Sequence, residues 1–349
     1  MTVTVIVRQH DAPVAVSEGE TILEAALQQG VPYPHGCRSG NCGACKSRLE
    51  SGEVDLAAYS EFALSEEERA EGLILACRAM PWSDAVVSWL ESDEVVLHPE
   101  RRLTCRVVGL AAMTHDIVGV RLAIESGGPF TFSAGQYAGL RFGDLPSRDY
   151  SMANRPDGSV LEFHVRRMGP GSVSAHVSER LRVGDVVTVQ GPLGTSYLRD
   201  KHTGPVIAIA GGSGLAPIKS IIDAALHQGM RQPMRLYFGA RDERDIYLED
   251  HFRALSAQHP NFSFIPVLSA SSGPTARRGG LVHEAAAADL VDLDGAKAYL
   301  AGPPPMVEAA TALLLERGVR RGDIHADAFY TEAEKQALAA PAPLAAAAQ

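Results

Sequence analysis

The stretch HGCRSGNCGAC, residues 35–45, contains three cysteines, and one further cysteine follows after another 31 residues. The four cysteines are Cys37, Cys42, Cys45 and Cys77. Glycines stand beside or between the first three, where a missing Cβ lets the backbone turn sharply and direct N–H groups at sulfur. The pattern predicts a metal site in which a tight loop supplies three thiolates and a later segment supplies the fourth.

The spacing of these cysteines favours one kind of metal site. The order C-x4-C-x2-C followed by a distant cysteine is typical of a plant-type 2Fe-2S cluster. Structural zinc is the alternative, but zinc sites usually join two close-spaced pairs of ligands, whereas Cys77 stands alone. We therefore expect an iron–sulfur cluster.

Length and composition indicate an ordinary globular protein of two or three domains, with 349 residues, 46% of them hydrophobic and 21% charged. The fifth cysteine, Cys105, is expected to be a buried and inert thiol. The N-terminus lacks the pattern of a signal peptide, which favours a cytoplasmic location. The longest apolar stretch, residues 205–226, is interrupted by Pro217, Lys219 and Asp223, which argues against a membrane span.

The negative charge is concentrated near the N-terminus. Residues 1–91 contain 14 acidic and 6 basic side chains, a balance of −8, whereas the whole chain has −10. Two interpretations remain open, an acidic face that is merely solvated and a docking surface for a basic patch on a redox partner. The same sign disfavours binding to nucleic acid.

Three consecutive patterns predict a multidomain α+β and α/β protein. In residues 1–91, alternating runs at 2–8 and 12–16 predict a hairpin, and Thr21 with Glu24 predicts a capping box for a helix that Gly30 ends, as in a β-grasp ferredoxin. Residues 92–102 are expected to form a linker. Short alternating runs at 103–110, 117–124, 136–142, 161–165 and 186–190 predict an antiparallel barrel over residues 103–203.

From residue 204 to 332 apolar strands alternate with helical segments, which predicts a parallel α/β domain. The expected strands are 206–210, 235–238, 262–268 and 298–301, and the expected helices are 218–226 and 306–315. Residues 333–349 are expected to form a flexible tail.

Three short motifs lie in the barrel and in the α/β domain. The sequence GGSGLAP at 211–217 follows a predicted strand and opens a helix, an arrangement that suits a pyrophosphate, although a glycine turn can also simply connect two elements. The sequence RDYS at 148–151 begins an expected strand at 150–154 and offers a guanidinium for phosphate beside a flat ring and a hydroxyl. The sequence AGPPPM at 301–306 ends a late strand, where ligands gather in open α/β sheets.

The order of these three parts resembles the ferredoxin–NAD(P)+ reductase family, and more narrowly the reductase components of bacterial multicomponent oxygenases such as the naphthalene dioxygenase group. The resemblance covers residues 1–330 and is clearest at 148–154, 197–205, 211–218 and 327–330. It implies an FAD site formed by Arg148, Tyr150, Ser151, Val165, Arg166, Gly171, Ser174 and Phe329. It implies a dinucleotide site formed by Gly212, Ser213, Gly214, Gly302, Pro303 and Met306. Tyr150, Ser151 and Phe329 would be the residues beside the reacting flavin ring.

Two departures and one choice concern these sites. Pro170 stands where the family has a glycine and cannot donate an N–H to phosphate, and Ala301 replaces a cysteine near the hydride path. After the strand at 235–238, Asp242 and Glu243 would repel a 2′-phosphate while Arg241 would attract one. We expect NADH to be preferred, with NADPH as the alternative.

The resemblance implies an NADH-dependent enzyme that passes electrons through FAD and a 2Fe-2S cluster to a Rieske ferredoxin or to a terminal aromatic-ring-hydroxylating oxygenase. Two alternatives remain. One is a reductase that serves a di-iron or haem monooxygenase or a deoxysugar dehydrase. The other is a flavin and iron–sulfur redox sensor without turnover.

Overall fold

The computed structural model describes residues 2–10, 12–41, 43–61, 63–90, 96, 98–331 and 333–334. The chain divides into two compact units, one of residues 1–95 with 330–349 and one of residues 96–329. Among the helices of these described ranges, none combines the length and the apolarity needed to cross a membrane.

The first unit is built on a mixed sheet with the strand order β2-β1-β7-β3-β5 and a small second sheet, β4-β6. Its strands are β1 (Thr2–Val7), β2 (Val14–Ser17), β3 (Lys46–Ser51), β4 (Val54–Leu56), β5 (Leu73–Leu75), β6 (Ala79–Pro81) and β7 (Ala85–Trp89). The helices are α1 (Ile22–Gln28) and α2 (Glu66–Ala70). The predicted hairpin is confirmed, with Thr2 opposite Ser17, and β7 runs parallel to β1.

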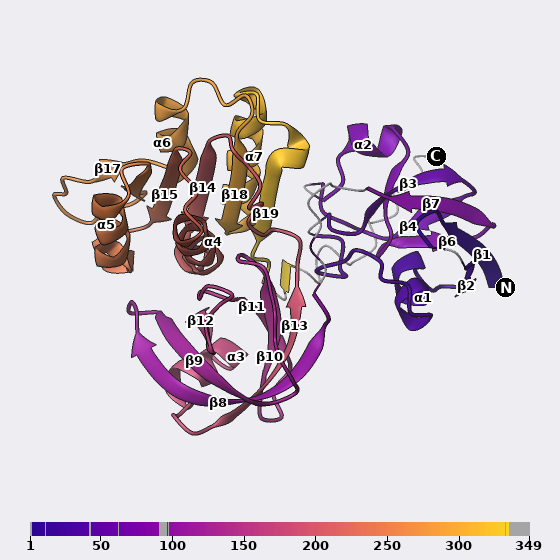
Figure 1. The fold of residues 1–349 in the computed structure, drawn as a ribbon, viewed down its shortest axis with the longest axis horizontal. Coiled ribbons are helices and arrows are strands. Elements are labelled where there is room, and N and C mark those ends of the chain that lie inside the picture. The colour runs from indigo at the N-terminus through magenta and orange to yellow at the C-terminus, as the bar shows by residue number, and fades with distance from the viewer. Residues whose placement is uncertain are drawn as a thin grey trace, which may run out of the picture. The chain divides into compact units, whose positions relative to one another are not determined.

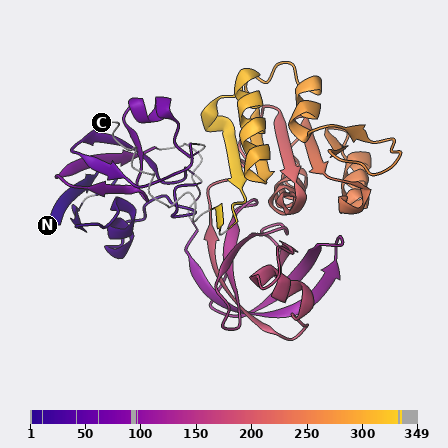
Figure 2. The ribbon, with the colours of Figure 1, turned by 180° about the vertical axis from the view of Figure 1, so that it is seen from behind.

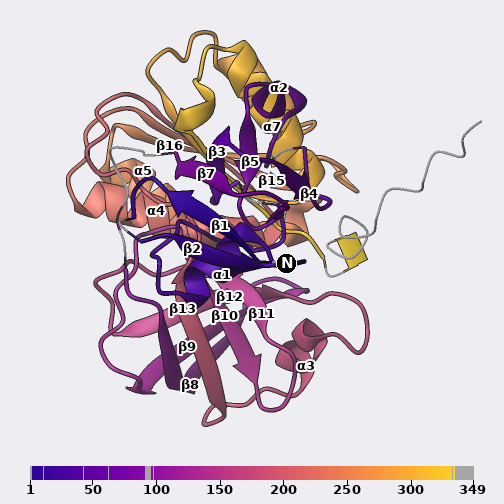
Figure 3. The same cartoon turned by 90° about the vertical axis from the view of Figure 1, so that its right-hand side faces the viewer.

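Local sequence signals explain how α1 begins and ends. Thr21 Oγ1 accepts the N–H of Glu24 while the Glu24 carboxylate accepts the N–H of Thr21, so the predicted capping box is present. Gly30, with φ of 80°, follows the end of the helix. Figure 3 shows α1 beside β2, where its buried face joins the core that Val14 and Val16 also form.

The second unit begins with a six-stranded antiparallel barrel of order β11-β10-β13-β8-β9-β12. Its elements are β8 (Arg101–Ala112), β9 (Ile117–Ser126), β10 (Tyr137–Phe142), β11 (Arg148–Ser151), β12 (Val160–Arg166), α3 (Val173–Glu179) and β13 (Val186–Leu193). A single bridge between Met152 and Phe163 brings the two edges together, so the barrel is nearly closed. The curved strands of the barrel are seen in Figures 1 and 2.

Two segments of this barrel differ from their expected limits. The strand expected at 150–154 begins earlier, because Arg148 to Ser151 pair along β10 and beyond them Met152 makes only the edge bridge. β8 begins at Arg101, inside the segment expected to be a linker, because Arg101 and Arg102 pair with Gly191 and Gln190 of β13.

The unit continues with a six-stranded parallel sheet of order β17-β16-β15-β14-β18-β19. Its strands are β14 (Val206–Gly211), β15 (Met234–Ala240), β16 (Phe262–Leu268), β17 (Arg278–Gly279), β18 (Lys297–Gly302) and β19 (Ile324–Ala328). Its helices are η1 (Gly212–Gly214), α4 (Leu215–His227), η2 (Glu243–Asp245), α5 (Glu249–Gln258), α6 (Val282–Asp289), α7 (Pro304–Glu316) and η3 (Arg321–Asp323). In Figures 1 and 2, α4 covers one face of the sheet, while α6 and α7 cover the other.

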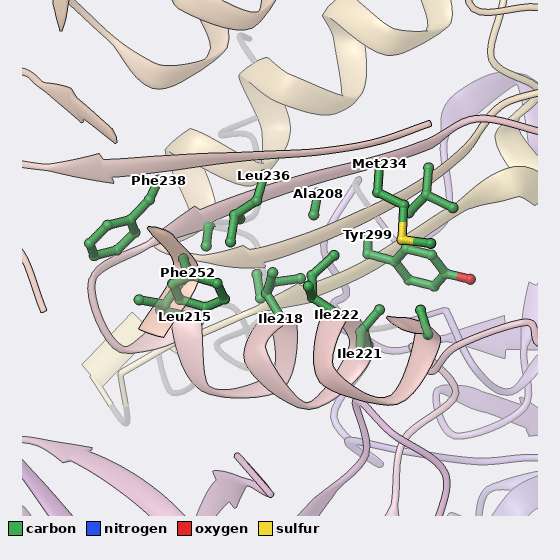
Figure 4. Close-up of a cluster of buried hydrophobic side chains, with 14 of the residues drawn as sticks. Ala208, Leu215, Ile218, Ile221, Ile222, Met234, Leu236, Phe238, Phe252 and Tyr299 are labelled. Atoms are coloured by element: carbon green, nitrogen blue, oxygen red, sulfur yellow. The ribbon is translucent and has the colours of Figure 1, made fainter. Parts of the chain in front are cut away.

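The packing of α4 on the sheet fixes the position of the glycine turn that precedes this helix. Ile218 and Ile222 of α4 point toward Leu236 and Ala208 of the strands (Figure 4), and all four side chains are buried. Because α4 follows η1 without a break, the same core that holds the helix also holds the turn at the carboxyl end of β14.

Candidate functional site

The cysteine loop of the first unit is wound by residues in left-handed backbone conformations. Arg38, Gly40 and Gly43 have φ of 55°, 80° and 71°. This winding lets the N–H groups of Ser39 and Asn41 reach Cys37 Sγ, at 3.5 and 3.2 Å. From the later segment, the N–H of Cys77 lies 3.4 Å from Cys45 Sγ. Backbone donors therefore surround the sulfur atoms, as thiolate ligands require.

Close packing makes glycine necessary at two points of this loop. A Cβ at Gly40 would lie 2.9 Å from side-chain atoms of Tyr59 and Arg78, and one at Gly43 would lie 3.2 Å from Ala63 O. Ser60 N donates to Gly40 O, which fastens the loop to the segment that precedes α2. In the same unit, the Tyr330 hydroxyl lies 3.0 Å from Ser60 Oγ.

The described thiols fit a bound iron–sulfur cluster. Cys45 and Cys77 are buried, while Cys42 lies outside the described residues. A hydrogen bond with the Cys45 thiol, followed by burial, raises the pKa of the Cys77 thiol, so positive metal ions are needed to make these groups thiolates together. The Nε–H of Arg78 is buried and has no hydrogen-bond partner among the described residues, and an anionic cluster would accept it.

The RDYS motif forms β11 at the open edge of the barrel. The Arg148 guanidinium donates to Ser147 O at 2.7 Å. The Tyr150 ring meets Phe142 edge to face, and burial raises the pKa of its phenol to about 12, so the hydroxyl keeps its proton. The Ser151 hydroxyl is buried and donates to Asp327 Oδ2 at 3.2 Å.

Asp327 begins the segment 327–330 in which the resemblance is clear, but the sequence analysis gave this residue no role. It lies on β19, which pairs with β18 so that Ala301 faces Asp327 and Gly302 faces Ala328. The next residue but one, Phe329, donates its N–H to Gly302 O at 2.8 Å. The end of the second unit is therefore fixed between β11 and the motif at 301–306, an arrangement that no local sequence signal reveals.

Val165 and Arg166 point in opposite directions from β12. Val165 is fully buried in the barrel core, so its side chain is enclosed by the barrel. Arg166 donates to Asp116 Oδ2 at 2.8 Å, and one of its terminal nitrogens lies 3.0 Å from where a Cβ would stand at Gly212. Arg166 thus links β12 to the glycine turn at 212–214.

The segment around Gly171 forms the start of α3. Gly171 has φ of 75°, and Ser172 caps the helix by accepting the N–H of Ala175. The Ser174 hydroxyl is buried, accepts the N–H of Met168 and lies 2.9 Å from Ser172 Oγ. The Ser174 hydroxyl therefore stabilises the turn before α3. Ser172, the helix cap, is a residue of this segment that the sequence analysis missed.

The two nucleotide motifs pack directly on each other. A Cβ at Gly211 would lie 2.6 Å from Met306 Sδ, one at Gly214 would lie 2.1 Å from Ala301 O, and one at Gly302 would lie 2.9 Å from Gly211 O. Backbone atoms of the facing loop leave no room for a side chain at Gly214 and Gly302, whereas at Gly211 the nearest atom is the sulfur of the flexible Met306 side chain. Pro303 precedes α7 as its N-cap, and Ser213 lies in the turn η1.

Residues 241–243, which are expected to decide between NADH and NADPH, follow β15. They form hydrogen bonds and an ion pair with the loop after β16. Asp242 caps η2 and accepts the hydroxyl of Ser272, while Glu243 accepts from Thr275 and from Arg277. Arg277 also forms a bidentate pair with Glu249 at 2.8 Å. Arg241 is exposed beside these pairs. A cavity of about 500 Å³ adjoins Glu243, Thr275 and Arg277.

A thiol loop for a cluster, a barrel strand with an arginine, a tyrosine and a serine, and a glycine turn on a parallel sheet together define a class. It is the class of flavin and iron–sulfur oxidoreductases that use a pyridine dinucleotide. Comparison with known families agrees. Residues 5–81 match the 2Fe-2S iron-sulfur cluster binding domain, residues 104–197 the oxidoreductase FAD-binding domain, and residues 208–312 the oxidoreductase NAD-binding domain.

Individual relatives match along nearly the whole chain. The ferredoxin–NAD(P)+ reductase component of a naphthalene 1,2-dioxygenase/salicylate 5-hydroxylase system from Ralstonia sp is 41% identical over 313 residues, 89% of this chain and 94% of that protein. The reductase subunit of an aromatic O-demethylase from Amycolatopsis sp. is 40% identical over 318 residues, 89% of this chain and 94% of that protein.

The solved structure of the Amycolatopsis cytochrome P450 reductase GcoB is similar with a TM-score of 0.75 and 39% identity, over 94% of this chain and 99% of that one. The chain belongs to the family of reductase components of multicomponent oxygenases, enzymes with FAD-binding, NAD-binding and 2Fe-2S domains.

Proposed function

We propose that the protein takes electrons from NADH and delivers them to a Rieske-type ferredoxin or directly to a terminal aromatic-ring-hydroxylating oxygenase. The observation that carries this proposal is the 41% identity, over 89% of the chain, with a reductase component of a naphthalene dioxygenase system. The acidic balance of residues 1–91 supports docking of a basic partner on the cluster-bearing unit.

In this proposal, residues of the barrel bind FAD. The Arg148 guanidinium contacts a phosphate, and Tyr150, Ser151 and Phe329 lie beside the flavin ring. Because Ser151 donates its only hydroxyl hydrogen to Asp327, its oxygen is left as an acceptor facing the site. The phenol of Tyr150 stays protonated and therefore adds no negative charge. Val165 contributes through its backbone, since its side chain is enclosed, and Gly171 and Ser174 shape the turn for the pyrophosphate.

The glycine turn at 212–214 and the motif at 302–306 bind the dinucleotide, with Arg241 near the adenosine ribose. Cys37, Cys42, Cys45 and Cys77 hold the cluster, and the N–H groups of Ser39, Asn41 and Cys77 stabilise negative charge on sulfur. The domains expected from the sequence are residues 1–91, 103–203 and 204–332, with a linker at 92–102 and a tail at 333–349, but β8 already begins at Arg101 and Tyr330 belongs to the first unit.

The bound cofactors supply hydride acceptance and the conversion of an electron pair into single electrons. The protein itself needs no acid–base group for this chemistry. Its residues place the dinucleotide against the flavin, hold Ser151 to Asp327 through a partly buried hydrogen bond, and direct N–H donors at the thiolates.

A second candidate function is electron transfer to a haem monooxygenase. It is favoured by the 40% identity with the aromatic O-demethylase reductase and by the likeness to the P450 reductase structure. These values differ little from those of the naphthalene dioxygenase relative. The identity of the terminal acceptor must therefore be measured.

Reconstitution of the holoprotein with purified partners tests the two candidates. NADH oxidation coupled to product formation is measured with a Rieske ferredoxin and its dioxygenase, with the dioxygenase alone, and with a P450 O-demethylase. We expect coupled turnover with the Rieske partners and full activity with ferricyanide in every sample. Efficient coupling to the P450 and none to the Rieske partners would replace the first candidate with the second.

A further inference from the structure

The two faces of β12 have different chemical character. Leu161, Phe163 and Val165 point into the barrel core, so the alternate residues Glu162, His164 and Arg166 lie on the outer face. An outer barrel face is normally wet, but the side chain of His164 is 0% exposed. The outer face of β12 is therefore covered by other parts of the second unit, and its polar groups need partners there.

The imidazole of His164 joins a carboxylate to a phenol. Its Nε2 lies 3.0 Å from Glu162 Oε1, and its Nδ1 lies 3.2 Å from the Tyr247 hydroxyl. Burial would raise the pKa of Glu162, but the bond from His164 and the charge of Lys219 lower it to about 2, so this carboxylate only accepts. Burial lowers the pKa of His164, so the ring is neutral and carries its hydrogen on Nε2. Nδ1 then accepts the O–H of Tyr247.

Tyr247 lies between β12 and the glycine turn at 212–214. It belongs to the connection from η2 to α5, and its ring meets His164 edge to face on one side and Phe238 on the other. Its O–H also points at Gly212 O, 3.4 Å away, so the single hydroxyl hydrogen is shared between His164 Nδ1 and this carbonyl. Gly212 has φ of 54° and no side chain of its own, so neighbouring groups must fix its position.

We propose that His164 and Tyr247 are a positioning pair that holds the glycine turn 212–214 at a set distance from β12. The pair acts through the carbonyl of Gly212 and thereby sets the affinity of the turn for the dinucleotide. This inference rests on the proposed function, in which the turn binds NADH. Neither residue touches a reacting atom.

The first test is Tyr247→Phe in the holoenzyme, which keeps the ring and removes the hydroxyl. The dissociation constant for NADH is taken from the saturation of anaerobic flavin reduction in a stopped-flow instrument. Losing one hydrogen bond predicts a rise of roughly two- to tenfold. Oxidation of photoreduced protein by ferricyanide does not involve NADH and keeps its wild-type rate.

Tyr237→Phe is the matched control. Tyr237 is also fully buried, lies on the neighbouring strand β15 and donates its hydroxyl to Asp289 at 3.1 Å, away from the glycine turn. Both variants lose stability, but we expect a changed dissociation constant only in Tyr247→Phe. An unchanged value in Tyr247→Phe, or an equal rise in Tyr237→Phe, overturns the inference.

A double-mutant cycle then tests the pairing itself. His164→Leu removes the acceptor that orients the Tyr247 hydroxyl, so it should weaken NADH binding in the wild-type background and have little further effect beside Tyr247→Phe. His164→Gln can still accept from the phenol and should recover part of the loss. Additive effects would show that His164 acts elsewhere and would refute the pair. Failure of wild-type FAD to be reduced by NADH would instead refute the proposed function.

Discussion

Cys45 and Cys105 are both buried thiols, but their surroundings differ. Cys45 accepts a backbone N–H from Cys77 and lies close to the loop that carries Cys37. Cys105 lies on β8 among the apolar side chains of the barrel core, where burial raises the pKa of its thiol to about 11. The environment, and not burial as such, separates a ligand from an inert thiol.

Replacing each of these cysteines with alanine should therefore have different results. We expect Cys45→Ala to lose the cluster and at least 90% of NADH-driven cytochrome c reduction, while ferricyanide reduction through the flavin is largely kept. Cys105→Ala, the matched control, should retain iron and both activities. Iron analysis and the two assays provide the readout. Equal loss of both activities in Cys45→Ala would mean that the cluster is needed for folding and not for transfer alone.

At the scale of elements, η2, α5 and the loop after β16 are joined by one set of ion pairs. Arg277 bridges Glu243 and Glu249. Hydrogen bonds from Thr275 and then from Arg277 lower the pKa of Glu243, and the hydrogen bond from Arg277 lowers that of Glu249 to about 2. Asp242 is occupied as a helix cap. Of the two carboxylates expected to repel a 2′-phosphate, Glu243 therefore also neutralises Arg277, which could attract one.

This arrangement predicts how nucleotide preference responds to mutation. The wild-type protein should prefer NADH, and Glu243→Gln should raise kcat/KM for NADPH several-fold because it leaves Arg277 with a single carboxylate partner. Asp250→Asn, which removes one exposed charge from the start of α5, serves as the control. Steady-state kinetics with both nucleotides measure the change. A wild-type preference for NADPH, or no gain in Glu243→Gln, would show that these ion pairs do not select the nucleotide.

His325 on β19 makes the stability of this strand depend on pH. Its ring stacks on Tyr299, and its buried Nε2 has no hydrogen-bond partner among the described residues. Burial, reinforced by nearby Arg199 and Lys297, holds the pKa of His325 well below its usual value. Below about pH 6.5, His325 therefore binds a proton in the unfolded chain but not in the folded protein. The free energy of unfolding falls as the pH drops below this value.

We expect His325→Phe to reduce the loss of unfolding free energy below pH 6.5 by up to about 1.4 kcal/mol per pH unit, which is the limit for the binding of one proton. The thermal midpoint of the holoprotein is compared at pH 7.5 and pH 5.5. His227→Gln, at an exposed position near the end of α4, should keep the wild-type slope. Parallel curves for wild type and His325→Phe would show that His325 titrates equally in both states.

At the scale of the whole molecule, charge is divided unequally. Residues 1–91 have a balance of −8 and the remaining chain −2. Glu66 and Glu67 are exposed at the start of α2, and the neighbouring Glu68 forms an ion pair with Lys46 at 2.7 Å. α2 follows Ala63, whose carbonyl packs against Gly43 of the cysteine loop, so exposed negative charge lies near the cluster loop.

Reversal of this charge should slow delivery of electrons to a basic partner. The double variant Glu66→Lys/Glu67→Lys is expected to lower the association rate about tenfold at low salt, and the difference should shrink near 0.1 M salt as charges beyond about 10 Å are screened. Glu308→Lys, an exposed position on α7 of the other unit, is the control. Stopped-flow reduction of the partner is measured against salt. A salt-independent rate in the wild type would leave the acidic residues as a solvated surface.

The sequence by itself determined the parts whose signals are local. The cysteine spacing, the capping box of Thr21 and Glu24, the alternation of the barrel strands and the glycine turn each lie within a few residues, where backbone geometry and side-chain chemistry act directly. Short or polar strands such as β3 and β19 gave no such signal, because their stability comes from neighbours that are distant in sequence.

Only the tertiary structure decided which distant residues contact these motifs. It brought Asp327 to Ser151, placed Tyr247 between His164 and Gly212, and occupied Asp242 and Glu243 with partners about 30 residues away. It also showed that Gly214 and Gly302 are required where two loops pack together. Such contacts depend on the folding of the whole chain, because hydrogen bonds and close packing between distant segments leave no periodicity in the sequence.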